Sequence, residues 1–484
     1  MKITAPPKVI LRFCDKYHVP TIRKIICDGL EELNIHPFGR TLLKPNLVAS
    51  GSVFDHAYTR AEFTEAVLLA LRDEAVSRIT ELAVGERSGI TIPTRYTYNE
   101  AAYDEMLKRL AVKRYCFEEE QQVEYKLDHE GRLRDYIFIP EVITRTDFFV
   151  NCPKFKAHPW TTVTFSMKNY IGLQDDRHRL IDHDHLLNQK VADLQYIIQP
   201  QFIAADAIIA GQGRMLTPIP YDLKLVIMGN NQVAFDSVCC NIIGIDPLSV
   251  EHIRLAYERG FGPVELSKIQ LSGDVSLDEA RKLGRGFQSG LIRVEDYFKD
   301  TNIKTYAGGP SEDESCDYCW GGCPGALEEA IEILRKFDPE TDQKMPPIHL
   351  VFGAYRGEIN AKPGEKVVFM GNCADWQGTI TGEKVSINKL PETRAKKDPY
   401  YAASSDIYEK MVAVTLRLFR SRKQGYIRLP GCPVSVAEQV LTLSNLGGTK
   451  NPYLDPRVAV RFTRAYLATR LANLLKFRPY QKRP

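Results

Sequence analysis

The sequence predicts an α/β protein with a largely parallel sheet and flanking helices, plus a smaller C-terminal α+β domain that holds a cysteine cluster. Between Val9 and about Gly273, short β-branched runs alternate with helical patterns, as in βαβ units. This alternation lapses after Gly273, and a segment rich in Gly, Ser and acids follows over 308–325. Three cysteines within that segment indicate that the second domain binds a ligand.

The order of the elements follows from hydrophobic periodicity. Five β-branched and apolar runs are expected to be strands of the first domain: 40–48, 79–86, 147–155, 201–209 and 223–230. Three segments with apolar residues at three- and four-residue spacing are expected to be helices: 59–75, 98–111 and 185–198. The second domain is expected to contain a helix over 326–337 and strands over 349–355 and 365–372.

These elements divide the chain into four parts. The predicted parts are an α/β anion-binding domain over 1–273, a connector over 274–310, a cysteine-rich iron–sulfur domain over 311–450 and a basic amphipathic helix over 451–484.

Composition excludes several classes of protein. Apolar residues make up 44% of the 484 residues and charged residues 26%, which does not fit a disordered, collagen-like or coiled-coil chain. No apolar run approaches eighteen residues, and the N-terminal segment lacks the layout of a signal peptide, so we expect a cytoplasmic protein. The 64 basic and 61 acidic side chains are too balanced to indicate a nucleic-acid partner.

The cysteine motif is the most specific signal in the chain. Cys316, Cys319 and Cys323 form a C-x-x-C-x-x-x-C-P run, in which closely spaced sulfurs can face one metal centre. Either Cys373 or Cys432, both in turn-like contexts, could close a four-cysteine site. We expect an iron–sulfur cluster of the 4Fe–4S type. Structural zinc is the inorganic alternative, because four thiolates also suit tetrahedral zinc, and buried free thiols are the third interpretation.

Polar residues at the ends of the predicted strands indicate a second site. In open α/β sheets the ligand lies beyond the carboxyl ends of the strands, and several lysines there favour a phosphate or carboxylate ligand. The residues expected to bind this anion are Lys44, Asn46, Asn151, Lys156, Asn169, Arg177 and Asp206. The residues expected to carry its chemistry are His158, Lys154, Lys168 and Glu86.

Within this second site, His158 is the preferred acid–base group, since an imidazole exchanges protons near neutral pH. Glu86 and Asp206 are expected to orient the lysines or to take a substrate proton. His183 and His185 offer a metal-binding alternative, or belong to a solvated loop.

The same residues make the chain resemble the family catalogued as domain of unknown function 362. The resemblance covers roughly 40–265, and its most specific part is NCPKFKAH (151–158) followed by TFSMKNYIG (164–172). Many members carry a ferredoxin-like cysteine motif, so the resemblance implies iron–sulfur binding here. The three-residue second gap departs from a bacterial two-cluster ferredoxin insert, which we therefore do not expect. The resemblance implies no particular reaction.

Together these features predict an iron–sulfur oxidoreductase in which the cationic site binds an anionic small molecule and the cluster relays electrons, with a redox partner protein as a further contact. One alternative is a non-catalytic electron-transfer or cluster-delivery protein. Another is a redox-neutral lyase or epimerase with an open iron site, which requires one iron without a cysteine ligand.

The C-terminal segment carries a strong excess of basic residues. From residue 457 onward there is no acid, and the basic residues are Arg457, Arg461, Arg464, Arg470, Lys476, Arg478, Lys482 and Arg483. Apolar residues at helical spacing predict an amphipathic helix: Val460, Leu467, Leu471, Leu474 and Leu475. We expect its apolar stripe to dock on the second domain, with an anionic membrane surface or an acidic partner protein as the alternatives.

Overall fold

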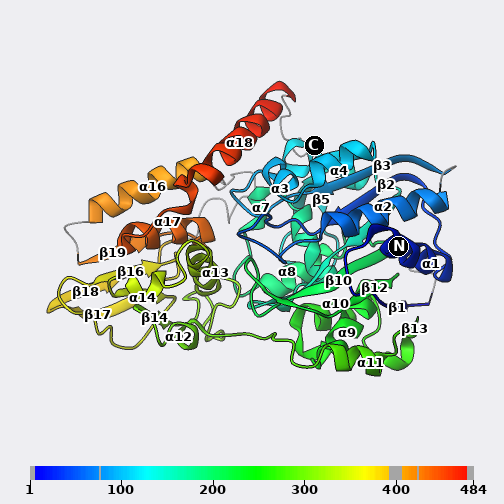
Figure 1. Ribbon diagram of the computed structural model, residues 1–484. Helices are drawn as coiled ribbons and strands as arrows, with labels where there is room; N and C mark the ends of the chain where they lie inside the picture. Colours follow the sequence, from blue (N-terminus) through cyan, green and yellow to red (C-terminus); the bar gives the residue numbers. More distant parts are fainter. Residues whose placement is uncertain (1–5, 76–77, 392–405, 422–424, 477–484) are drawn as a thin grey trace. The chain divides into compact units, whose positions relative to one another are not determined.

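The computed structural model describes residues 6–75, 78–391, 406–421 and 425–476 (Figure 1). The chain divides into two compact units, the first formed by 1–175, 188–290 and 465–484, and the second by 176–187 and 291–464. The last helix, α18 (Pro456–Lys476), begins in the second unit and ends in the first.

The first unit is built on a sheet whose main path runs β13-β1-β12-β10-β7-β2-β3-β4. Along this path only the β12 pairings are antiparallel, which confirms the predicted, largely parallel sheet. The strands of this unit are β1 (Lys8–Phe13), β2 (Gly39–Pro45), β3 (Ile79–Glu86), β4 (Lys113–Cys116), β5 (Gln122–Lys126), β6 (Tyr136–Pro140), β7 (Phe148–Cys152), β8 (Lys154–His158), β9 (Thr162–Val163), β10 (Phe202–Gln212), β11 (Ile219–Tyr221), β12 (Leu225–Gly229) and β13 (Gln270–Gly273).

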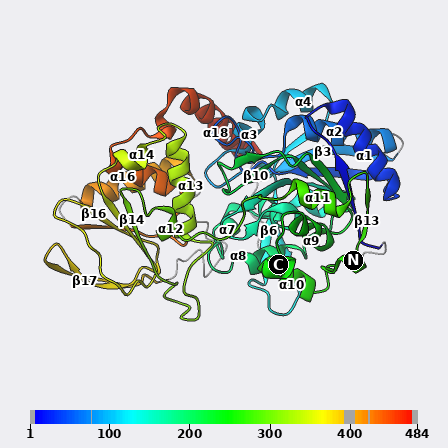
Figure 2. The ribbon, with the colours of Figure 1, turned by 60° about the horizontal axis from the view of Figure 1, so that its bottom comes forward.

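Helices cover both faces of this sheet (Figures 1 and 2). They are α1 (Val19–Glu32), α2 (Ala61–Ala75), α3 (Thr94–Glu100), α4 (Tyr103–Arg109), α5 (Glu141–Thr144), α6 (Phe165–Lys168), α8 (Leu187–Leu194), α9 (Gln232–Ile242), α10 (Glu251–Glu258) and α11 (Leu277–Leu283). α1 packs on α2, while α9 packs on α10 and α11. α1 turns Ile22, Ile26 and Leu30 into the core, at the four-residue spacing of one helix face.

The second unit contains a four-stranded parallel sheet of order β14-β15-β16-β19 and an antiparallel β17–β18 hairpin. Its strands are β14 (Ile303–Ala307), β15 (Ile348–Phe352), β16 (Lys366–Met370), β17 (Trp376–Ile380), β18 (Glu383–Ile387) and β19 (Tyr426–Leu429). Its helices are α7 (Asp176–Arg179), α12 (Val294–Tyr297), α13 (Cys323–Arg335), α14 (Thr341–Lys344), α16 (Ile407–Arg420) and α17 (Val436–Gly447), together with the first part of α18.

Local sequence explains where several of these helices begin. The Ser435 side chain accepts a hydrogen bond from the Glu438 backbone N–H, and Glu438 bonds back to the Ser435 backbone, which forms a capping box at the start of α17. Asp406 caps α16 in a related way, by accepting from the backbone N–H groups of Tyr408 and Glu409. These caps fix the ends of two helices that flank the second sheet.

Two predicted elements are divided in the structure. The strand expected over 147–155 is β7 and β8, separated at Pro153, which has no backbone N–H to continue the ladder. The helix expected over 98–111 becomes α3 and α4, because Ala102 lies at φ +61° between them.

The predicted tail helix is α18, and its expected continuation over 477–484, with Arg478, Lys482 and Arg483, lies outside the described residues. Among the described helices, none combines the length and hydropathy that crossing a bilayer requires.

Candidate functional site

The second unit holds a cavity at the carboxyl edge of its parallel sheet. Its walls include residues that follow each strand: Gly308 after β14, Gly353 after β15, Cys373 after β16 and Cys432 after β19. This edge is where open α/β sheets bind ligands, because the loops that follow parallel strands meet there.

Four cysteines line this cavity: Cys319, Cys323, Cys373 and Cys432. Cys323 is the first residue of α13, so its sulfur lies at the positive end of a helix dipole. The backbone N–H of Val434 also donates a hydrogen bond to its Sγ over 3.1 Å. Both features stabilise negative charge on this sulfur. We call the space that these four residues line the cysteine cavity.

Cys316, the first cysteine of the motif, lies apart from this set. Its Sγ donates to the carbonyl oxygen of Tyr318 over 3.2 Å, and it lines a neighbouring open groove together with Asp313, Arg356 and Asp375. The structure therefore brings together four of the five predicted cysteine ligands. Both candidates for the fourth position, Cys373 and Cys432, are among the four.

Burial keeps the thiols of the cavity in their neutral form unless a cation stabilises the thiolates. Burial raises the pKa of Cys373 to about 11 and holds the pKa values of Cys319 and Cys323 well above the ordinary value. For Cys319, the nearby Asp184 carboxylate and the other cysteines raise the pKa further. A metal ion offsets this cost, because thiolate ligands exchange their protons for the metal.

Glycines keep space open between the sulfurs. Gly371 has φ +95°, and a Cβ atom on it would lie 3.4 Å from the Sγ atoms of both Cys323 and Cys373. A Cβ atom on Gly322 would lie 2.5 Å from the Sγ of Cys319. Side chains at these positions would occupy the space that a metal centre needs, so the cavity fits such a group.

Two carboxylates complete the donor set. Cys432 Sγ lies 3.5 Å from Asp184 Oδ2, and ligand atoms of Asp184, Glu312 and Cys432 all lie within 4.8 Å of one another. His185, from the same segment, lies 3.6 Å from Asp313 at the groove. The sequence interpretation considered His183 and His185 but gave Asp184 no role.

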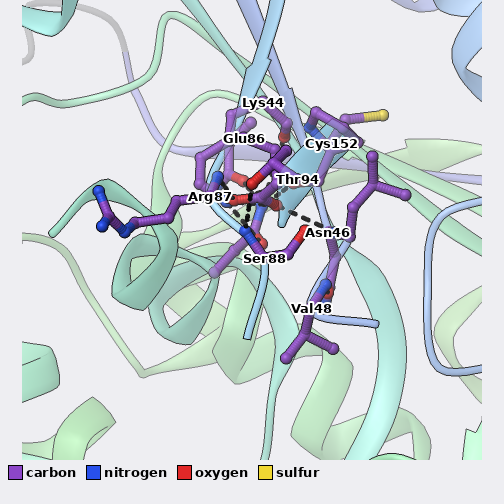
Figure 3. Close-up of polar contacts among 12 residues, drawn as sticks. Lys44, Asn46, Val48, Glu86, Arg87, Ser88, Thr94 and Cys152 are labelled. Carbon is purple, nitrogen blue, oxygen red and sulfur yellow. Dashed lines mark hydrogen bonds and ion pairs between the residues drawn. The ribbon is translucent and has the colours of Figure 1, made fainter. Parts of the chain in front are cut away.

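The predicted anion site in the first unit contains a buried ion pair (Figure 3). Lys44 Nζ lies 2.8 Å from Glu86 Oε1, and both side chains are almost fully buried at the ends of β2 and β3. Glu86 also accepts hydrogen bonds from the backbone N–H groups of Leu47 and Arg87. Asn46, two residues after Lys44, is 5% exposed, and its Oδ1 accepts a hydrogen bond from the Val48 backbone N–H.

The K-N-x-x-G segment covers this pair. Asn169 Oδ1 accepts a hydrogen bond from Lys44 Nζ over 3.2 Å, and Asn169 Nδ2 donates to Asn151 Oδ1 over 2.8 Å. A Cβ atom on Gly172 would lie 2.2 Å from Glu86 Oε1. The asparagine thus binds the lysine, and the glycine lets the chain pass directly over the carboxylate.

A second buried pair joins Lys154 and Asp206. Lys154 Nζ lies 2.9 Å from Asp206 Oδ2, with both side chains fully buried, and burial lowers the pKa of Lys154. Tyr17 donates its hydroxyl hydrogen to Asp206 Oδ1 over 2.7 Å and accepts a hydrogen bond from Lys154 over 3.0 Å. Sequence reasoning missed Tyr17, since a lone tyrosine more than a hundred residues away carries no local signal.

The remaining predicted residues have different settings. Lys156 donates to the carbonyl oxygens of Ala57 and Met215, and His158 Nδ1 accepts from the Trp160 backbone N–H. Lys168 ends α6 and is 8% exposed. Arg177, expected at the same site, lies in α7 and belongs to the second unit.

Lys44 and Lys154 each have a counter-charge within the protein, so these two lysines do not by themselves require a bound anion, and the anion site stays a prediction. Glu86 and Asp206 supply the counter-charge instead, each at hydrogen-bond distance. Lys156 is engaged by two backbone carbonyls.

Comparison with known proteins agrees with the resemblance seen in the sequence. The chain is 21% identical over 238 residues to the thylakoid-associated protein sll1697 of Synechocystis sp., covering 47% of this chain and 70% of that protein. A search of solved structures finds the lactate racemase apoprotein from Thermoanaerobacterium thermosaccharolyticum, at 9% identity and a TM-score of 0.34 over 88% of this chain and 93% of that one. A likeness at that level carries no argument about activity.

A family model, described as a domain of unknown function (DUF362), matches residues 41–241. This range includes both buried ion pairs, the K-N-x-x-G segment and Asp184 of the cavity wall, but none of the four cysteines that line the cavity. The chain is thus similar to this family over residues 41–241, which is less than half of its length.

Proposed function

We propose that the second unit binds a 4Fe–4S cluster through Cys319, Cys323, Cys373 and Cys432, and that the protein is an iron–sulfur oxidoreductase. The observation that carries this proposal is the cysteine cavity, in which cysteines from separate loops line one space at the carboxyl edge of the sheet. Four cysteine thiolates are the usual ligands of such a cluster.

The spacing of the sulfurs favours a cluster over a single zinc ion. Four sulfurs bound to one zinc at about 2.3 Å lie roughly 3.8 Å apart. Among the described residues, no three of the four cavity sulfurs lie within 4.8 Å of one another. The one group of ligand atoms that is this close is Asp184, Glu312 and Cys432, which contains a single cysteine. In a cluster each sulfur binds a different iron, so the wider spacing fits.

When bound, the cluster would supply one-electron transfer. The protein's own groups would set the charge around it. The Val434 N–H and the first turn of α13 stabilise negative charge on Cys323, whereas Asp184 and Glu312 add negative charge near Cys432. Hydrogen bonds to the sulfurs and the net charge nearby are the main means by which a protein tunes a cluster's potential.

A non-catalytic electron-transfer protein is the second candidate. It is favoured by the buried lysines of the first unit, because Lys44, Lys154 and Lys156 already bind acceptors within the protein. An oxidoreductase that acts on an anionic small molecule would need further cations. Four cysteines around one cavity do not favour the open-iron lyase, which needs only three.

The test is anaerobic reconstitution with ferrous iron and sulfide, followed by iron and sulfide analysis and electron paramagnetic resonance after reduction. The wild-type protein should hold about four irons and about four sulfides. Cys319→Ser, Cys323→Ser and Cys373→Ser should each lose most of this content. Cys316→Ser, a matched change in the same motif, should retain it.

Two outcomes would contradict the proposal. One zinc per chain in anaerobically purified protein, with no sulfide, would assign the cavity to a structural metal. A loss of the cluster in Cys316→Ser, together with its retention in Cys432→Ser, would show that the ligand set is wrong.

A further inference from the structure

The face of α18 that carries most of its leucines is exposed. Val460, Leu467, Leu471, Leu474 and Leu475 are 54–76% exposed, so the expectation that they dock on the protein is wrong. The helix packs through other positions instead: Phe462 and Thr469 are buried. Thr469 Oγ1 also donates a hydrogen bond to Glu119 Oε1 over 2.9 Å.

These exposed residues lie along one side of the helix, and we call them the leucine row. Residues 460, 467, 471 and 474 are separated by seven, four and three positions, which places them on one side of a helix. Single exposed leucines are common on protein surfaces, but a row of this kind marks a surface that contacts something apolar.

The charges along this helix indicate which apolar partner fits. Residues 456–476 contain Arg457, Arg461, Arg464, Arg470 and Lys476 and no acid. Arg464 falls within the apolar row itself, between Val460 and Leu467. If two copies paired through this face, like charges would meet, whereas the phosphates of an anionic bilayer offer counter-charge beside an apolar interior.

A second helix, α16, also carries exposed apolar residues close to arginines. In the second unit, Val412, Leu416 and Phe419 of α16 follow one another at helical spacing and are 48–64% exposed. Arg417 and Arg420 lie in the last turn of the same helix. α16 contacts the first part of α18 through a 2.6 Å hydrogen bond between Tyr408 and Thr463.

We propose that the leucine row of α18 binds the surface of an anionic lipid bilayer, with its leucines in the apolar boundary and its arginines at the lipid phosphates. Helices that lie in the plane of a membrane insert apolar side chains at the headgroup boundary and contact the lipid phosphates through basic side chains. This inference is independent of the proposed cluster.

The experiment is co-sedimentation of the full chain with vesicles. The protein should pellet with phosphatidylcholine vesicles that contain about 30% phosphatidylserine at low salt, and much less with phosphatidylcholine alone. The triple variant Leu467→Gln, Leu471→Gln, Leu474→Gln should bind the anionic vesicles at least about tenfold more weakly, because it removes the apolar contact and keeps the charge.

A matched control changes exposed leucines elsewhere. Leu248 and Leu291 are 40% and 44% exposed, and the double variant Leu248→Gln, Leu291→Gln should bind the vesicles as the wild type does. Thermal unfolding of both variants checks that they fold.

Three outcomes would overturn the inference. One is absence of binding to anionic vesicles at low salt, and another is equal binding to neutral and anionic vesicles. The third is a dimer, seen by analytical ultracentrifugation, that disappears only in the triple variant, which would assign the face to a second copy of the chain.

Discussion

Lys44 Nζ lies 2.8 Å from Glu86 Oε1, with the two side chains 1% and 2% exposed. Each charge is therefore compensated by the other and not by water. Removing one partner of such a pair leaves a buried, uncompensated charge, which costs about 3–5 kcal/mol. We therefore expect Glu86→Gln to lower the free energy of unfolding by about that amount. The double variant Lys44→Met, Glu86→Gln should recover much of the loss. Urea unfolding measures both.

The control for this prediction is an exposed ion pair. Asp28→Asn breaks the ion pair between Asp28 and Lys24, whose side chains are 45% and 76% exposed, respectively. It should lower the free energy of unfolding by less than about 1 kcal/mol. The account is contradicted if Glu86→Gln lowers the free energy of unfolding no more than Asp28→Asn does. It is also contradicted if the double variant Lys44→Met, Glu86→Gln is as unstable as Glu86→Gln.

Gly172 should resist substitution for a steric reason. A Cβ atom there would lie 2.2 Å from Glu86 Oε1 and 2.8 Å from Lys44 Nζ, two atoms held in place by the ion pair. Gly172→Ala should therefore destabilise the protein by about 1–3 kcal/mol in the same urea assay. Gly425→Ala is the control, since no atom lies within 4 Å of its added Cβ. Equal stability of the two variants would contradict this account.

Much of the fold was predictable because it depends on local patterns. The alternation of β-branched and amphipathic segments predicted the parallel sheet, and turn contexts identified Cys373 and Cys432. The partner of each lysine was not predictable in the same way. Pairing of β2 with β7 puts Lys44 opposite Asn151, and such a register depends on the packing of the whole sheet.

The cysteine site shows the same limit. The C-x-x-C spacing grouped Cys316 with Cys319, but the structure turns Cys316 toward the neighbouring groove. Spacing within a loop does not determine which way each side chain points. Asp184 could not be found from its surroundings in the sequence, because it reaches Cys432 from a segment that is 248 positions away in the chain.

Gly371 provides a test of the cysteine cavity that leaves every cysteine intact. Gly371→Ala places a methyl group 3.4 Å from the sulfurs of both Cys323 and Cys373, so it should lower the iron and sulfide content after reconstitution. Gly364→Ala is a close control, because Gly364 has a similar φ of +92° but no atom within 4 Å of the added Cβ. Equal cluster content in the two variants would mean that no ligand occupies the space between those sulfurs.

His252 should make the stability of the first unit depend on pH. Its imidazole is fully buried, and Nδ1–H donates to Asn188 Oδ1 over 2.9 Å. Within the described structure Nε2 has no hydrogen-bond partner. Burial, reinforced by the nearby positive charge of Lys168, lowers the pKa of His252 from 6.5 to about 3.

Below pH 6.5 the unfolded chain therefore takes up a proton at His252 that the folded protein does not bind. This contribution to stability is complete above that pH and is lost as the pH falls toward about 3, at up to about 1.4 kcal/mol per pH unit. His252→Gln keeps an N–H donor for Asn188 but removes the titration. Urea unfolding between about pH 7 and about pH 5 should show a smaller loss of stability in this variant than in the wild type. His36→Gln, at an exposed imidazole, should leave the wild-type loss unchanged. Equal pH dependence in the wild type and His252→Gln would mean that His252 takes up its proton as readily in the folded protein as in the unfolded chain.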